Sequence, residues 1–180
     1  IGKNLTRGLG AGMNPDIGRQ AAEENRDEIQ DVLKGADLVF ITCGLGGGTG
    51  TGASSVIADA AHDVGALVVA VVTKPFSFEG AQRSRIAQEG MVKLKDKVDT
   101  LIVVPNDRIF TIIEKDTTLI KAFEAVDDIL RSAVQGIAEL IAMPGIINVD
   151  FADVKTIMEN AGSALVGIGI ASGQDRAMTA

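Results

Sequence analysis

The chain has 180 residues, a net charge of −7 and a pI of about 4.7, and 46% of its residues are hydrophobic. This composition is typical of a globular protein with a sizeable core, and its negative charge disfavours nucleic acid as the main partner, because phosphate backbones are bound by basic patches. The single cysteine, Cys43, excludes an internal disulfide, and the single histidine, His62, argues against a histidine-rich metal site or a Ser-His-Asp triad.

Apolar runs rich in β-branched residues alternate with helical stretches along the chain. The expected strands are 37–43, 66–72, 100–104 and 164–170. The expected helices are 15–34, 52–63, 79–95 and 117–142. Because the strands are continuously apolar, we expect a parallel sheet that is buried on both faces by helices. Ligands of such α/β folds bind beyond the carboxyl ends of the strands.

The first glycine-rich segment is Gly-Leu-Gly-Ala-Gly-Met-Asn, residues 8–14. Asn14 is suited to cap the following helix, and Pro15 is suited to its first position. The helix start could offer N–H groups to an anion. A simple turn with a cap remains the alternative.

The second glycine-rich segment, residues 46–52, reads Gly-Gly-Gly-Thr-Gly-Thr-Gly between an expected strand and an expected helix. Glycines allow backbone N–H groups to approach a phosphate, and the helix dipole adds positive potential. The Gly-Lys-Ser/Thr ending of a Walker loop is missing. A dinucleotide fingerprint is possible, but the strand 66–72 is not followed by the acidic residue that would bind the ribose. An NAD(P)-dependent oxidoreductase therefore stays as the alternative to a nucleotide phosphate site, and a plain glycine turn is a third option.

Each of three residue pairs later in the chain has an ordinary structural interpretation besides a functional one. Glu79 and Arg83 are four residues apart and could form a simple helical ion pair. Phe123 and Asp127 share one face of the long helix 117–142, where the aromatic ring also belongs to the apolar stripe. Asp150 and Asp153 stand at an expected helix start, where the ordinary role is capping and favourable interaction with the dipole.

These motifs occur together in one family. The chain resembles FtsZ, the bacterial tubulin homologue of the cell-division ring, over essentially its whole length. The markers are Gly-Leu-Gly-Ala-Gly (8–12), the glycine loop 46–52, Thr-Lys-Pro-Phe (73–76) with Glu79-Gly80, Pro105-Asn106-Asp107, and Asn-Val-Asp-Phe-Ala-Asp-Val (148–154). The resemblance implies an α/β, parallel Rossmann-like GTPase sheet of the tubulin/FtsZ type, with helices on both faces and a long central helix.

The resemblance also implies how the chain is organised. Residues 1–116 would be a nucleotide-binding domain without its first strand, 117–143 the central helix, and 144–180 a catalytic loop and the start of a C-terminal domain. The first residues are Ile1-Gly2 rather than methionine, and we expect this chain to be a piece of a longer protein.

The resemblance assigns roles to individual residues around GTP or GDP. The expected nucleotide-binding residues are Ala11, Gly12, Met13, Asn14, Gly47, Gly48, Thr49, Gly50, Thr73, Glu79, Arg83, Asn106, Phe123 and Asp127. Glu79 would bind the ribose and Arg83 a phosphate. Phe123 would stack on guanine, while Asp127 would accept its N1–H and N2–H groups, with Asn106 beside it. Mg²⁺ is expected mainly on the nucleotide phosphates, with no metal site formed by one chain alone.

Catalysis is expected between subunits. In the family, residues that match Asn148, Asp150 and Asp153 act on the nucleotide of the adjacent subunit. A helix of about 25 residues spans roughly 37 Å, so these acids would lie far from the base site of their own chain. The resemblance thus implies a head-to-tail homopolymer whose GTPase activity depends on assembly, and a cytoplasmic protein at mid-cell.

The remaining expectations concern other partners. Division proteins would bind through a C-terminal tail that this chain lacks. Neither nucleic acid binding nor direct membrane insertion is expected. A GTP-binding filament protein that does not hydrolyse GTP is a further rival, and Asp150 and Asp153 argue against it.

Overall fold

The computed structural model describes residues 1–113, 116–142, 150–166, 169, 171–173 and 175–179. Four parallel strands form one sheet in the order β1-β2-β3-β4. The strands are β1 (Leu38–Gly44), β2 (Leu67–Lys74), β3 (Thr100–Pro105) and β4 (Gly162–Ala164). The expected parallel sheet is therefore confirmed.

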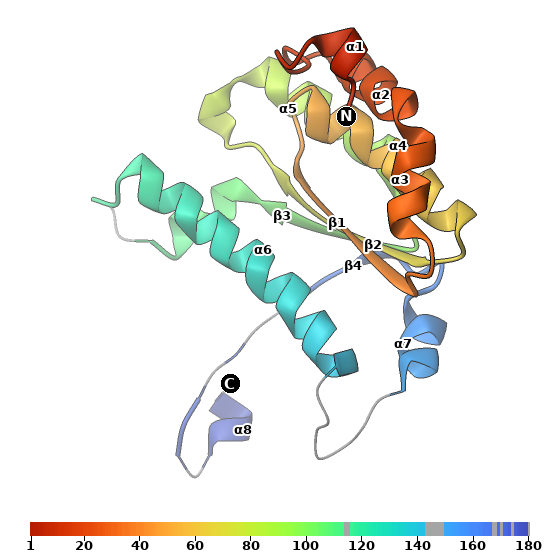
Figure 1. Ribbon diagram of the computed structural model, residues 1–180. Helices are drawn as coiled ribbons and strands as arrows, with labels where there is room; N and C mark the ends of the chain where they lie inside the picture. The colour runs from red at the N-terminus through yellow and green to blue at the C-terminus, as the bar shows by residue number, and fades with distance from the viewer. Residues whose placement is uncertain (114–115, 143–149, 167–168, 170, 174, 180) are drawn as a thin grey trace.

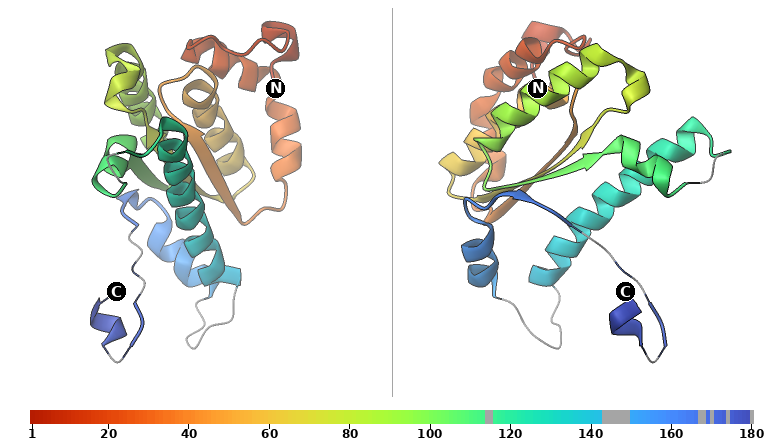
Figure 2. Two further views of the ribbon diagram at one scale, coloured as in Figure 1. Left: turned by 90° about the vertical axis from the view of Figure 1, so that its left-hand side faces the viewer. Right: turned by 180° about the vertical axis from the view of Figure 1, so that it is seen from behind.

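Helices cover both faces of this sheet (Figures 1 and 2). The helices are α1 (Lys3–Thr6), α2 (Pro15–Glu24), α3 (Arg26–Leu33), α4 (Thr49–Asp63), α5 (Ala81–Lys95), α6 (Leu119–Ala142), α7 (Phe151–Met158) and α8 (Arg176–Thr179), with 3-10 turns η1 (Ser77–Glu79) and η2 (Asn106–Thr111). Helices α4 and α5 lie on one face and α6 crosses the other, while α2 and α3 form an outer layer over α4. Within the described residues, no helix has the length and apolar character needed to cross a bilayer.

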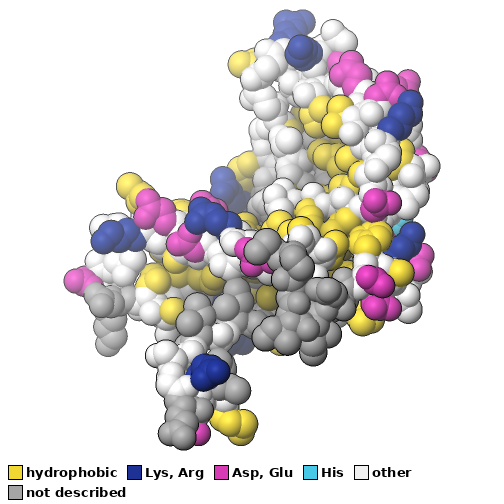
Figure 3. Space-filling view, turned by 60° about the horizontal axis from the view of Figure 1, so that its bottom comes forward, with side chains coloured by type: hydrophobic (Ala, Val, Ile, Leu, Met, Phe, Trp, Pro, Cys, Tyr) yellow, Lys and Arg dark blue, Asp and Glu magenta, His cyan; other side chains and the backbone are white. Residues whose placement is uncertain are grey.

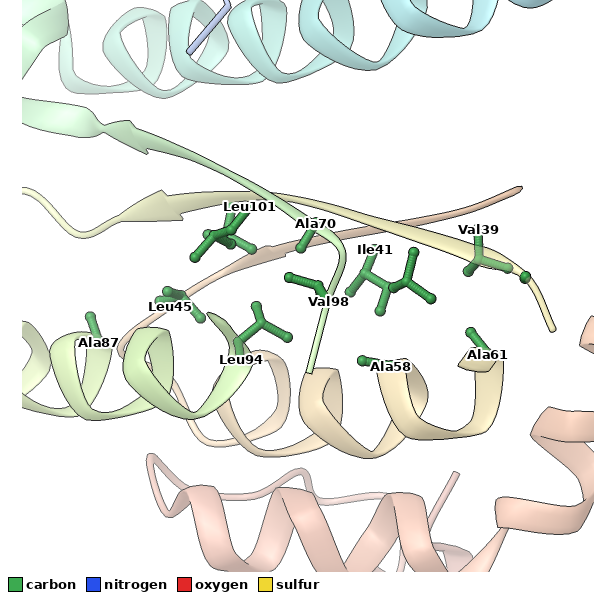
Figure 4. Packing of buried hydrophobic residues seen from close by; sticks show 13 residues of the cluster. Val39, Ile41, Leu45, Ala58, Ala61, Ala70, Ala87, Leu94, Val98 and Leu101 are labelled. Carbon is green, nitrogen blue, oxygen red and sulfur yellow. The ribbon is translucent and has the colours of Figure 1, made fainter. Parts of the chain in front are cut away.

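The central strand β2 explains why the apolar runs are continuous. All of its residues except Lys74 are buried. Val68, Ala70 and Val72 pack in the cluster with α4 and α5, where Figure 4 labels Ala70, and the alternate residues face α6. Side chains of a strand point alternately to opposite faces, so a strand covered on both sides must be apolar at every position.

Helices α2 and α4 approach each other closely through two glycines. A Cβ atom on Gly18 would collide with the backbone of Gly48, and one on Gly52 would collide with the backbone of Pro15. Larger residues at either position would separate the helices. Both helices start beside a glycine-rich loop, so this contact also sets the distance between the two loops.

The structure differs from the sequence-based expectation in two elements. The expected helix 15–34 is interrupted at Asn25, which leaves helical geometry. The Asn25 side chain accepts a hydrogen bond from the Gly2 N–H (2.7 Å) and donates to Glu28 (3.0 Å). Asparagine favours such local bonds over a helix interior. The expected strand 164–170 overlaps the observed pairing with β3 only at Ala164, since β4 begins at Gly162, and residues 167, 168 and 170 of the expected range lie outside the described residues.

Candidate functional site

The glycine loop 46–52 follows β1 and leads into α4, as the sequence indicates. The Leu45 N–H donates to the Thr73 carbonyl (2.9 Å), and the Gly46 N–H donates to the buried Thr51 hydroxyl (2.9 Å). Gly48 is the N-cap of α4 and has no side chain, so no side chain caps this helix. The first N–H groups of α4 thus remain available for an anion.

Thr51 is a structural residue that sequence reasoning missed. Its hydroxyl bonds across the loop, whereas the Thr49 side chain is exposed at the start of α4. Two threonines in one glycine loop look equivalent in sequence, and only the fold separates their environments.

The segment 8–14 lies directly against this loop. A Cβ on Gly48 would stand 2.7 Å from the Ala11 Cβ and 2.8 Å from the Asn14 backbone nitrogen. The Asn14 side chain accepts from the Asp16 N–H (3.0 Å), so the expected cap of α2 is confirmed. The structure therefore places the N-termini of α2 and α4 side by side. The segment 8–14 is thus more than a simple turn with a cap.

Met13 has an unusual backbone conformation within this segment. Its φ of 61° is left-handed, a region that favours glycine. Met13, with Gly12 and Asn14, lines an open hollow between the segment 8–14 and α5. Backbone strain of this kind is concentrated at functional sites, and here it adjoins the phosphate loop.

A cavity of about 330 Å³ opens beyond the carboxyl ends of β1 and β2. Its lining includes seven of the expected nucleotide-binding residues: Gly47, Thr73, Glu79, Arg83, Asn106, Phe123 and Asp127. It also includes residues that sequence reasoning did not select: Gly44, Leu45, Pro75, Val126 and Leu130. Its size is in the usual range for small-molecule sites. Segments separated by more than 80 positions thus meet at one edge of the sheet.

Glu79 and Arg83 form the ion pair that their spacing suggests, and both also line the cavity. Arg83 Nη1 donates to Glu79 Oε2, while Glu79 Oε1 accepts from the Phe76 N–H (2.9 Å). The two interpretations are therefore compatible. The carboxylate fixes the turn before α5 and holds the guanidinium at the edge of the cavity.

The far wall of the cavity combines an aromatic face with oxygen acceptors. Phe123 packs edge-on against buried Phe76, at 5.1 Å and 89°, yet it is 40% exposed. Asn106 is buried, and its Oδ1 has no hydrogen-bond partner among the described residues. A buried acceptor without a partner is costly, and a donor from a ligand or a water molecule would satisfy it. With the Asp127 carboxylate nearby, this wall suits a flat ring bearing N–H donors.

Cys43 is close to the phosphate loop but is chemically unreactive. Burial raises the pKa of its thiol to about 11, and a smaller opposing effect comes from its hydrogen bond with Ser54. The thiol therefore stays protonated at neutral pH. Cys43 packs as a small, partly buried residue against the core cluster beneath the sheet.

The acidic residues expected in catalysis lie elsewhere. Asp150 is the N-cap of α7 without a side-chain capping bond, and Asp153 is in the first turn. Helix α7 contacts the start of β3, whereas the glycine loop 46–52 follows the carboxyl end of β1, so the two sites lie at opposite ends of the parallel strands (Figure 1). One chain does not bring them together. Asn148 lies outside the described residues.

Together, the parallel sheet, the phosphate loop and the adjoining cavity define a nucleotide-binding α/β domain. Residues 1–114 match the model of the Tubulin/FtsZ family, GTPase domain. The chain belongs to the Tubulin/FtsZ family. The expected family and fold are thus confirmed, and the oxidoreductase alternative is not favoured.

Solved structures agree with this assignment. The chain is 52% identical to FtsZ from M. jannaschii, described as an empty dimer, with a TM-score of 0.94; the match covers 99% of this chain and 52% of that one. CetZ1 from Haloferax volcanii, a GDP-bound monomer, is 25% identical with a TM-score of 0.72, over 91% and 48% of the two chains. The chain therefore spans about half the length of these relatives.

Proposed function

We propose that this chain is the nucleotide-binding part of a self-assembling GTPase of the FtsZ type. The observation that carries the proposal is the cavity wall formed by Phe123, Asp127 and the unpartnered Asn106 oxygen, set next to the phosphate loop. Guanine presents N1–H and N2–H as adjacent donors, which two acceptors can satisfy. Adenine lacks this donor pair.

Hydrolysis would be completed by a neighbouring subunit. Asp150 and Asp153 are exposed near the amino ends of the strands, whereas the cavity lies at their carboxyl ends. Head-to-tail stacking would therefore bring one subunit's acids to the next subunit's nucleotide. Phosphoryl transfer depends mainly on positioning and charge stabilisation. Two carboxylates could orient the attacking water. The matched FtsZ structure from M. jannaschii is a dimer, which supports self-assembly of this kind.

Within the described residues, no three histidine, cysteine, aspartate or glutamate side chains converge on a possible metal site. We propose that Mg²⁺ is held mainly by the nucleotide phosphates, and we assign it no step. We further propose that residues 1–180 work within a longer chain, in the bacterial division ring.

Nucleotide selectivity tests the proposal. Asp127→Ala should weaken GTP binding by about 1.5–3 kcal/mol, because it removes a charged acceptor from the guanine edge. ATP binding should be weak in the unmutated protein and in the variant. Calorimetry with both nucleotides measures these differences.

Asp128→Ala is the matched control for this experiment. Asp128 is the next residue of α6, and its carboxylate pairs with Arg131 at 2.8 Å on the exposed surface. This variant should bind GTP normally. Equal affinity of the unmutated protein for ATP and GTP would refute the guanine assignment.

The isolated chain of 180 residues should bind GTP weakly or not at all and should not form cooperative filaments. Strand β1 is at the edge of the described sheet, and α6 exposes Leu119, Ile120 and Leu140. Figure 3 shows hydrophobic side chains at the surface of one face. Unpaired strand edges and apolar patches favour aggregation.

Calorimetry with GTP and sedimentation at raised protein concentration test this expectation, with the full-length protein as the reference. Micromolar affinity together with GTP-dependent pelleting of the 180-residue chain would contradict it.

A further inference from the structure

A buried carboxylate at the start of β3 lies outside the site described above. Asp99 is only 5% exposed. Its Oδ2 accepts a hydrogen bond from the Val68 N–H of β2 (2.8 Å), and its Oδ1 accepts from the Asn160 N–H just after α7 (3.3 Å). His62 Nε2, near the end of α4, lies 3.7 Å from Oδ2. One side chain therefore contacts three separate segments.

The neighbouring Thr100 makes a second attachment to the same segment. Its hydroxyl donates a hydrogen bond of 2.7 Å to the backbone carbonyl of Met158, which is the last residue of α7. The Asp99 backbone carbonyl accepts from the Gly162 N–H at 2.8 Å. Asp99, just before β3, and Thr100, its first residue, thus hold both the end of α7 and the start of β4.

This attachment determines where α7 points. The helix has eight residues and is about 12 Å long. Among its residues only Val154 is buried, while Phe151 and Met158 pack partly against the core beneath β2. Such a short helix gains little orientation from packing alone, so its bonds at the C-terminal end decide the position of Asp150 and Asp153 at the other end.

We propose that Asp99 and Thr100 are positioning residues that aim the acidic start of α7 at the nucleotide of the neighbouring subunit. The proposal rests on the function proposed above. Neither residue would touch nucleotide. Their effect would pass through the geometry of α7, so their loss should lower hydrolysis while leaving nucleotide binding unchanged.

Two variants of the full-length protein test this role. Asp99→Asn leaves one side-chain acceptor for two N–H donors, and Thr100→Val removes the donor to Met158 with little change in shape. GTP turnover per mole of polymer should fall roughly 10- to 100-fold, since a misplacement of about 1 Å can cost that much. GTP affinity should stay unchanged. Hydrogen exchange of the backbone amides of residues 151–158 should become faster.

Leu94→Ala serves as the control for a general loss of stability. Leu94 is a fully buried residue of α5 in the cluster on the α4/α5 face of the sheet, whereas α7 packs against the cluster on the other face. This variant should melt at a lower temperature but keep normal exchange in α7 and normal turnover per polymer. If folded Asp99→Asn and Thr100→Val match the unmutated protein in exchange and turnover, the positioning role is wrong.

Asp153→Ala separates this proposal from the underlying function. If Asp153→Ala hydrolyses GTP at the normal rate, the catalytic role of the acids is wrong, and with it the functional part of this inference. If Asp153→Ala is inactive while both positioning variants behave normally, the function stands and the positioning role is overturned.

Discussion

Replacing Gly48 with valine should abolish GTP binding. A Cβ at this position would be 2.7 Å from the Ala11 Cβ, 2.8 Å from the Asn14 nitrogen and 3.0 Å from the Ala11 carbonyl oxygen. Backbone atoms cannot turn away as a flexible side chain can. The branched side chain would therefore push the segment 8–14 away from the phosphate loop and close the space where N–H groups approach a phosphate. Calorimetry or fluorescence titration with GTP measures the loss.

Folding must be checked separately for this variant. Gly136→Val makes the same replacement on α6, where a Cβ would meet nothing within 4 Å. It should fold and bind GTP normally. Circular dichroism and thermal melting show whether Gly48→Val is still folded. Normal GTP binding by a folded Gly48→Val protein would mean that the loop 46–52 is not the phosphate site.

Asp153→Ala in the full-length protein should leave GTP binding nearly intact and reduce hydrolysis by about 100-fold or more, the scale of losing a positioned group that stabilises the transition state. The reason is location: Asp153 is exposed on α7, away from the cavity of its own chain. Phosphate release during assembly measures the effect. Asp31→Ala, which removes an exposed carboxylate from α3, should be normal.

Mixing tests whether the site is shared between subunits. Asp153→Ala binds GTP but lacks an acid, whereas Gly48→Val should lack GTP but keep both acids. Junctions between the two should recover part of the turnover. Absence of recovery at every ratio, in filaments shown to contain both variants, would argue against catalysis by the neighbouring subunit.

Features set by local chemistry were predictable from the sequence. The cap formed by Asn14 and Pro15 needs only neighbouring residues, and the apolar run followed by glycines predicted the order of strand, glycine loop and helix that β1, 46–52 and α4 show. The four-residue spacing of Phe123 and Asp127 put both on one face of α6, and the structure shows both lining the cavity.

Features set by distant contacts were not predictable in this way. The interruption at Asn25 depends on Gly2, which is 23 residues away. The start of β4 depends on bonds to Asp99 rather than on where apolar residues begin. The unpartnered oxygen of Asn106 and the distinct environment of Thr51 emerge only when segments far apart in sequence are packed together.

The contact between α2 and α4 through Gly18 and Gly52 has a mechanical consequence. The helices touch backbone to backbone, without long side chains between them that could change rotamer and absorb a displacement. Each helix also begins at one of the two adjoining glycine-rich segments, 8–14 and 46–52. A shift of the loop 46–52 would therefore be transmitted to the segment 8–14 through the tightly packed helices α4 and α2. The outer layer formed by α2 and α3 would then move together with this loop.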